Sequence, residues 1–265
     1  MRHRPADAGR PRFDIAEIVR EHRAALEAEV RLSPEQRRVL TDMAQCRTAA
    51  LGGHVDACAS CDYERPSYNS CRNRHCPKCQ ALAQEAWIAE RSEQLLAEGH
   101  FHLVFTMPSE IRPLAKFAPA LIYDALFVAA AATLQQLAAE NLGAKLGVTM
   151  VLHTWTRTLL FHPHVHAIVT GGGLSLDGTR WIPRDGRFLF HVKVMGKLLR
   201  GKMLDALRRL HAAGRFQDFD GFRDPQGFDA LMMKLAKHRW VVYAKAPFRQ
   251  SQHVGIRCTD PVLPA

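Results

Sequence analysis

The sequence predicts an α+β protein with two parts, a helical N-terminal module and an incomplete sheet of ferredoxin-like topology. Three observations lead to this prediction. Apolar residues recur at helical spacing near the N-terminus, six of the seven cysteines fall between Cys46 and Cys79, and strand-like and helical segments alternate after residue 99. We expect the module to cover residues 1–98, the sheet domain residues 99–248, and an aberrant, disordered tail residues 249–265.

Helical signals dominate the first part. Residues 14–30 have helical periodicity, and the segment 33–36 (SPEQ) supplies an N-cap serine, a proline at the first helical position and a capping-box glutamine. A third amphipathic helix is expected over residues 80–98, with Gly99 as its stop. The cysteines therefore lie between helices.

Strands and helices alternate in the second part. Its opening order of strand, helix, strand and strand is the beginning of a ferredoxin-like sheet. We expect strands at residues 100–108, 148–156, 164–170, 187–194 and 240–245, and helices at residues 114–141, 196–213 and 228–238.

The composition favours a folded protein with a polyanionic partner. The chain has 265 residues, of which 47% are hydrophobic, and its formal net charge is +10. Such a charge is typical of nucleic-acid-binding proteins, although other basic proteins share it. The N-terminus has no apolar core of the secretory kind, and Asp124 interrupts the most apolar segment, residues 117–139. We expect a cytoplasmic protein, associated with the nucleoid if it is bound to DNA, and no membrane span.

Two Cys-x2-Cys pairs predict a structural zinc site. Each pair can aim two thiolates at one point, and a tetrahedral zinc needs four such ligands. The 14 residues between the pairs are typical of zinc ribbons. We predict a closed Zn²⁺ site that folds the module and does not catalyse, with the ligands Cys58, Cys61, Cys76 and Cys79.

Other sulfur and nitrogen donors lie close to these pairs and form a second candidate zinc set. Alternatively, the two cysteines are small buried residues and the two histidines contact nucleic acid or water. The set consists of Cys46, His54, Cys71 and His75. Four basic residues between the cysteines are expected either to contact phosphates or to form a solvated rim, namely Arg65, Arg72, Arg74 and Lys78.

Histidines alternate in the segment 161–173, FHPHVHAIVTGGG. In a strand, His164 and His166 share one face and lie about 7 Å apart along the backbone, so both can bind one cation. Pro163 lacks a ladder donor and is expected to place His162 before the strand. Two adjacent buried imidazoles without a partner would be costly, which favours a metal site.

Three classes of metal site use such a histidine pair. An amidohydrolase barrel requires eight strand–helix units, and only about 100 residues follow the pair. A cupin requires an acidic ligand a few residues further on, and residues 167–173 contain none. There remains the nuclease with a His-hydrophobic-His (HUH) motif, in which a divalent cation polarises a scissile phosphate.

The chain resembles the insertion sequence 91 family of HUH rolling-circle transposases over residues 46–248. The resemblance rests on CRTAALGGHVDAC, SYNSCRNRHCPKCQ, HFHLVFTMP, LHTW, FHPHVHAIVTGGGLS, LRGKM and WVVYAKAPF. It implies a zinc-binding domain followed by an HUH domain. In this family a tyrosine attacks a phosphodiester of one DNA strand, leaving a 5′-phosphotyrosyl link, and Mg²⁺ or Mn²⁺ acts as Lewis acid.

The resemblance also implies residue roles. It makes His164 and His166 ligands of the divalent cation, and a third ligand is expected from His153 on the neighbouring strand or, as second choice, from His102. The implied partner is DNA, as single-stranded or hairpin transposon ends. The basic helix of the second part is expected either to bind this DNA or to be a solvated face, through Lys197, Arg200, Lys202, Arg208 and Arg209.

The chain departs from the family after WVVYAK. There the family continues with a segment resembling YLARYTHR, which holds the nucleophile, whereas residues 249–265 contain no tyrosine. Tyr243 is the nearest tyrosine, and its context is that of a structural strand residue. We therefore expect a truncated transposase that binds DNA and does not complete covalent cleavage. The alternative is a non-catalytic zinc-ribbon DNA-binding protein or a transposase remnant.

Overall fold

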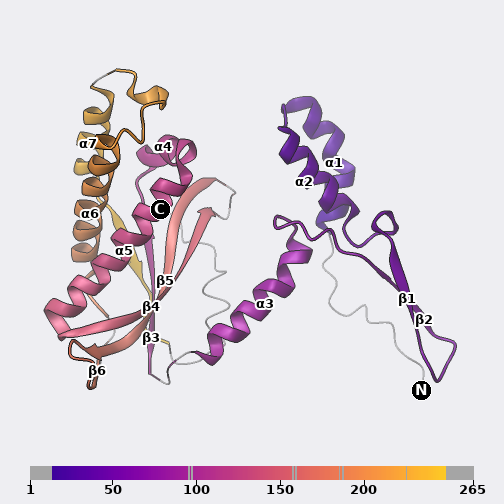
Figure 1. The fold of residues 1–265 in the computed structure, drawn as a ribbon, viewed down its shortest axis with the longest axis horizontal. Coiled ribbons are helices and arrows are strands. Elements are labelled where there is room, and N and C mark those ends of the chain that lie inside the picture. Colours follow the sequence, from indigo (N-terminus) through magenta and orange to yellow (C-terminus); the bar gives the residue numbers. More distant parts are fainter. Residues whose placement is uncertain are drawn as a thin grey trace. The chain divides into compact units, whose positions relative to one another are not determined.

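The computed structural model describes residues 14–248, except for residues 95, 97, 157, 159, 185, 187 and 225 (Figure 1). The chain divides into two compact units, residues 1–91 and residues 92–265. Helices and antiparallel strands form both units, which confirms the α+β class. The tail predicted for residues 249–265 lies outside the described residues.

Two packed helices open the first unit, α1 (Ile15–Glu29) and α2 (Pro34–Gln45). Each begins with a capping box, in which the N-cap side chain and the N3 side chain satisfy each other's backbone N–H groups. The box predicted from SPEQ is confirmed, since Ser33 and Gln36 form it. Local sequence therefore sets both helix starts.

An antiparallel hairpin follows, β1 (Gly53–Ala57) and β2 (Glu64–Tyr68), after the short helix η1 (Ala49–Leu51). This hairpin was not expected from the sequence. Nearly all of its residues are exposed, so its strands lack the alternation of apolar and polar residues that identifies a half-buried strand. Helix α3 (Pro77–Glu93) ends the unit and begins earlier than expected, with a proline at its start.

The second unit is built on an antiparallel sheet with the strand order β4-β5-β3-β7. Its β-α-β-β-α-β succession is the ferredoxin-like arrangement that was predicted. All four strands of this arrangement belong to the described residues, and a short β6 (Trp181–Pro183) pairs with β5. The strands are β3 (His100–Thr106), β4 (Ala144–Trp155), β5 (Phe161–Ser175) and β7 (Val241–Ala244).

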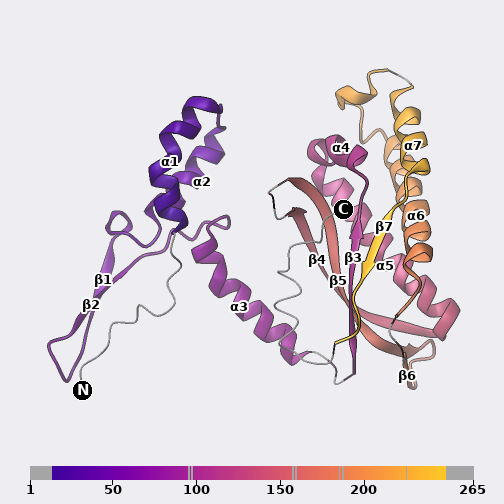
Figure 2. The ribbon, with the colours of Figure 1, turned by 180° about the vertical axis from the view of Figure 1, so that it is seen from behind.

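Helices cover one face of this sheet, as Figures 1 and 2 show. Alternate strand residues such as Phe101, Leu103 and Val165 point into the core that these helices close, so the residues between them face the other side. The elements are η2 (Ser109–Ile111), α4 (Arg112–Phe117), α5 (Pro119–Leu142), α6 (Val192–Ala212), η3 (Asp220–Phe222) and α7 (Gly227–Lys237).

The helix predicted over residues 114–141 is divided at Ala118. This residue precedes Pro119 and has φ −124° and ψ 63°, because a proline disfavours the helical conformation in the residue before it. Among the described residues, α5 is the one helix long and apolar enough to span a membrane. Its buried face, which includes Leu126 and Leu134, contributes to the core of the sheet domain.

Two expectations about strands are wrong. The described residues of the segment 187–194 form no strand, because Leu189 and Phe190 are buried in bends and α6 starts at Val192. Strand β5 begins at Phe161, so Pro163 lies inside it. The proline is tolerated there because the pairing with β4 shifts register at that point.

Candidate metal centres

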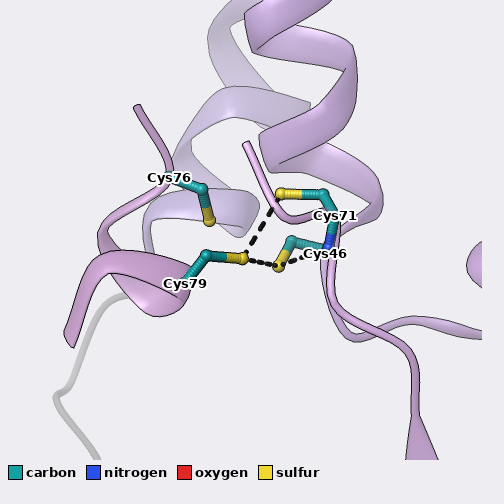
Figure 3. Close-up of side chains that lie close together, drawn as sticks. All are labelled: Cys46, Cys71, Cys76 and Cys79. Carbon is teal, nitrogen blue, oxygen red and sulfur yellow. Dashed lines mark hydrogen bonds between the residues drawn. The ribbon is translucent and has the colours of Figure 1, made fainter. Parts of the chain in front are cut away.

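Four cysteine sulfurs of the first unit converge on one point (Figure 3). Cys46 caps the end of α2, Cys71 follows β2, and Cys76 and Cys79 lie at the start of α3. The four Sγ atoms lie within 4.8 Å of one another, and Cys79 Sγ is 3.5 Å from Cys46 Sγ and 3.6 Å from Cys71 Sγ. Sulfurs around a tetrahedral zinc lie about 3.8 Å apart, given Zn–S bonds of about 2.3 Å. The cluster therefore has the size of a four-thiolate zinc site.

The backbone turns sharply beside two of these cysteines. Arg47 and Arg72, which directly follow Cys46 and Cys71, have φ angles of 57° and 54°. This left-handed conformation costs a non-glycine residue about 1–3 kcal/mol. The turn also directs the Cys71 N–H at Cys46 Sγ, at 3.5 Å. Strain next to two ligand candidates supports a role in a site.

The thiols differ in how readily they ionise. Burial raises the pKa of Cys46, and burial likewise raises the pKa of Cys71 to about 12. Burial also opposes ionisation of Cys79, but hydrogen bonds from Cys46 and Cys71 outweigh it and lower its pKa to about 7. Cys79 therefore ionises more readily than Cys46 and Cys71, and a cation bound here would displace protons from those two thiols.

This cluster differs from the predicted zinc ligand set. Cys76 and Cys79 belong to both, but Cys58 and Cys61 lie in the exposed turn of the β1–β2 hairpin, where Cys58 Sγ is 3.3 Å from Ser60 Oγ. The spacing between cysteines cannot reveal this, because the unpredicted hairpin separates one Cys-x2-Cys pair from the other. Cys46 takes part because α2 ends beside Cys71.

The second predicted zinc set is not brought together. Cys46 and Cys71 belong to the four-sulfur cluster, whereas the exposed His54 pairs with Asp56 at 3.4 Å. His75 is also exposed, and its Nε2 accepts a hydrogen bond from Arg74. Among the basic residues predicted beside the cysteines, Lys78 pairs with Asp14 at 2.5 Å, and Arg72 is exposed.

Three imidazoles gather on the face of the sheet that the helices leave uncovered. His153 of β4 pairs directly with His164 of β5, and His166 follows two residues later on the same face. One nitrogen from each ring lies within 4.8 Å of the others. His164 is 0% exposed and His166 2%. Pairing of β4 with β5 therefore adds the expected third histidine to the predicted pair.

His164 has a defined proton position. Its Nδ1 lies 2.6 Å from the carbonyl oxygen of His162, which can only accept, so Nδ1 donates and Nε2 keeps its lone pair. This Nε2 is buried and has no hydrogen-bond partner among the described residues. Burial lowers the pKa of His164 to about 4, and the nearby His153 contributes in the same direction. The ring is therefore neutral at pH 7, in the form that binds a cation.

The neighbouring histidines occupy other positions. His162 lies inside β5, but its Nδ1 accepts a hydrogen bond from Arg112 at 2.8 Å. His102 of β3 places Nε2 2.9 Å from His166 Nδ1 and so contacts a ring of the cluster from outside it. A contact of this kind can hold a metal-binding imidazole in one orientation.

Tyr243 lies on the same sheet face as the histidines. It pairs with Val104 on β3, and Val104 pairs with His166 on β5. Residues paired across strands share a face, so Tyr243 is two strands, about 10 Å, from His166. Its side chain is 38% exposed.

The predicted basic helix is α6, and its residues have different surroundings. Arg200 donates a hydrogen bond to the Ala236 carbonyl oxygen at 3.0 Å, and Arg209 pairs with Asp205 at 2.8 Å. Lys197 and Arg208 are exposed, whereas Lys202 is half-buried. These residues do not form one continuous face.

Two family models match the chain. The one described as "Transposase zinc-binding domain" matches residues 18–107, and the one described as "Putative transposase" matches residues 147–257. The second match extends nine residues beyond Phe248, where the resemblance of the sequence motifs ends. No solved structure matches the chain.

Two curated proteins are similar to the chain. "Putative transposase y4qJ" of Sinorhizobium fredii is 44% identical over 247 residues, which are 91% of this chain and 62% of that protein. "Transposase for insertion sequence element IS801" of Pseudomonas savastanoi pv. phaseolicola is 39% identical over 141 residues, which are 52% of this chain and 34% of that protein. The matched regions thus span less than two thirds of either relative.

Proposed function

This chain belongs to the insertion sequence 91 family of transposases, and from that premise we propose that it acts in DNA transposition by binding a phosphodiester of one DNA strand at the histidine cluster. One observation carries the proposal. The buried, unpartnered Nε2 of His164 lies among the nitrogens of His153 and His166. Such an arrangement is costly unless a cation completes it.

The donor atoms indicate which cation suits this cluster. Three imidazoles are poor ligands for Mg²⁺, which prefers oxygen, and better ligands for Mn²⁺. A bound Mn²⁺ would polarise a phosphoryl oxygen and orient the strand. The protein's own contribution is to fix two of the rings: the His162 carbonyl holds the His164 proton at Nδ1, and His102 Nε2 contacts His166 Nδ1.

A manganese titration tests this site. Replacing His164 by alanine should weaken Mn²⁺ binding, followed by electron paramagnetic resonance of the free ion, by at least about 100-fold. His162→Ala is the matched control, because it removes a neighbouring ring on the same strand and keeps the carbonyl that orients His164. Equal losses in both variants would contradict the proposed ligand set.

The zinc of this family is proposed to bind to Cys46, Cys71, Cys76 and Cys79. Their convergence supports this set. Four thiolates leave no open coordination position, so the ion would stabilise the first unit and take no part in the reaction.

Covalent cleavage is a separate step that needs a nucleophile. We propose that this chain binds single-stranded or hairpin transposon ends and does not itself complete cleavage, because none of its four tyrosines lies in a YLARYTHR-like segment. Incubation with labelled single-stranded DNA and Mn²⁺ should yield no protein–DNA adduct on denaturing gels. If an adduct forms, the proposal fails, and its loss in Tyr243→Phe would identify Tyr243 as the nucleophile.

A further inference from the structure

A basic groove of about 330 Å³ lies between α6 and the start of β7; we call it the α6–β7 groove. Lys193, Lys197 and Arg200 line one wall at the spacing i, i+4 and i+7, which places them on one stripe of the helix. Lys237 and Arg239 line the other side. The lining contains these five permanent cations and no aspartate or glutamate.

Most of these cations are not neutralised. Arg200 donates to the Ala236 carbonyl, and His238, which also lines the groove, pairs with Glu110 at 2.6 Å. The ion pairs of the described residues include none of the other four cations, Lys193, Lys197, Lys237 and Arg239. Like charges around one hollow repel each other, so an anion bound there would be stabilised by all of them.

The floor of the groove is close-packed and apolar. A Cβ atom added to Gly196 would lie 2.4 Å from the Trp240 carbonyl oxygen, so the absence of a side chain at this position lets α6 approach β7 closely. Trp240, Val241 and Val242 supply apolar lining. The groove therefore combines a cationic rim with an apolar floor, of which Val241 is the exposed part.

The groove is distinct from the histidine cluster. Val242 pairs with Phe105, which points into the helix-covered core, whereas the histidines lie on the opposite face of the sheet. β7 is the last strand in the order β4-β5-β3-β7 of the described sheet. A DNA strand that leaves the histidine face can therefore continue around this edge into the groove.

We infer that the α6–β7 groove binds the phosphodiester backbone of a single DNA strand. This inference rests on the proposed function, in which DNA is the partner. Lys193 and Lys197 lie about 6 Å apart along α6, given the helical rise, a separation comparable with the spacing of successive phosphates in an extended strand. Three of the five cations are lysines, which contact phosphates as point charges without requiring the two-pronged geometry of arginine with carboxylates.

Salt dependence of DNA binding tests the inference in the full zinc-loaded chain. The probe is a fluorescent 20-nucleotide oligothymidine, in buffer without Mg²⁺ or Mn²⁺, so neither cleavage nor the cation at the histidine cluster contributes. Lys193→Gln/Lys197→Gln should remove two phosphate contacts and reduce the slope of log K against log salt by about 1.4. The ratio of Kd at 200 mM salt to Kd at 50 mM should then fall about sevenfold.

Lys145→Gln/Arg215→Gln is the matched control, because it removes the same charge from two exposed residues of the same domain that lie outside the groove lining. It should leave the slope unchanged. Equal slopes in both double variants, or no change in the lysine variant, would overturn the inference. It would also be overturned if polyglutamate of equal length displaced the oligonucleotide at equal concentration. Failure of the manganese titration alone would refute the proposed cation site and leave the groove intact.

Discussion

The cysteine cluster yields the sharpest prediction, because the spacing of the cysteines and their positions in the structure nominate different zinc ligands. Cys79 belongs to both four-cysteine sets and Cys58 only to the one predicted from spacing, whereas Cys46, which the sequence placed in the second candidate set, belongs to the observed cluster. Three single cysteine-to-serine variants therefore separate the two. We expect Cys46→Ser and Cys79→Ser to lose zinc and Cys58→Ser to retain it.

The size of the effect follows from linkage between metal binding and folding. At a free zinc concentration 100 times Kd, the bound ion stabilises the first unit by about 2.7 kcal/mol. A serine that weakens zinc binding 100-fold removes most of this stabilisation. The loss is about 2.3 kcal/mol, because an ion present at its weakened Kd still contributes about 0.4 kcal/mol. The first unit has 91 residues, and at roughly 4–8 °C per kcal/mol for such a domain its Tm should fall by about 9–18 °C.

The assays are zinc content by mass spectrometry after gel filtration and thermal unfolding by circular dichroism. Cys58→Ser should keep the zinc content and the Tm of the unsubstituted chain, since Cys58 is exposed. Loss of zinc in Cys58→Ser together with retention in Cys46→Ser would refute the assignment drawn from the structure. Retention in Cys79→Ser would refute both ligand sets.

Three further predictions concern the sheet domain. His102→Ala should weaken Mn²⁺ binding about 10- to 100-fold, because it removes the contact to His166 Nδ1. The control variant His100→Ala, on the same strand, should leave the Mn²⁺ affinity unchanged. Equal Mn²⁺ affinities of the two variants would show that the contact of His102 with His166 is unimportant. Between pH 6.5 and about 4 the unfolded chain binds a proton at His164 that the folded chain does not, so the free energy of unfolding should fall by roughly 1.4 kcal/mol per pH unit as pH decreases. Denaturant titrations should show a weaker pH dependence in His164→Asn. Gly196→Ala should lower the free energy of unfolding by about 1–3 kcal/mol, because the added methyl group clashes with the Trp240 carbonyl oxygen. Gly201→Ala on the same helix has nothing within 4 Å of the added Cβ and should raise the free energy of unfolding by about 0.5–1 kcal/mol. Equal stabilities of the two variants would contradict the close approach of α6 to β7.

The sequence predicted the helices and strands correctly where the residues that determine an element lie within that element. The capping box at Ser33 and the apolar periodicity of residues 14–30 depend on residues within one or two turns, so α1 and α2 are readable from the sequence. The order of strands and helices likewise predicted the ferredoxin-like sheet. At Leu189 and Phe190 tertiary burial outweighs the local pattern: the apolar residues predicted a strand, but the described residues of the segment 187–194 form buried bends and the start of α6.

At the histidine site, the sequence pattern and the tertiary structure each supply a different part of the arrangement. Alternation in FHPHVH shows that His164 and His166 share a face of a strand, because side chains alternate along every strand. The third ring comes from the register of β4 against β5, which places His153 opposite His164. The proton position on His164 depends on the His162 carbonyl oxygen, a contact that the residue types do not reveal.

The sequence by itself therefore determined the family, the α+β class, the histidine pair and the presence of a cysteine-rich module. Only the tertiary structure decided which four sulfurs meet, because that depends on where α2 ends relative to Cys71 and on a hairpin that separates Cys58 and Cys61 from the other cysteines. The tertiary structure also assembled the α6–β7 groove, in which the cations of α6 lie 37 to 46 residues before Lys237 and Arg239. Spacing along the chain limits which residues can meet, but the packing of the elements between them determines which do.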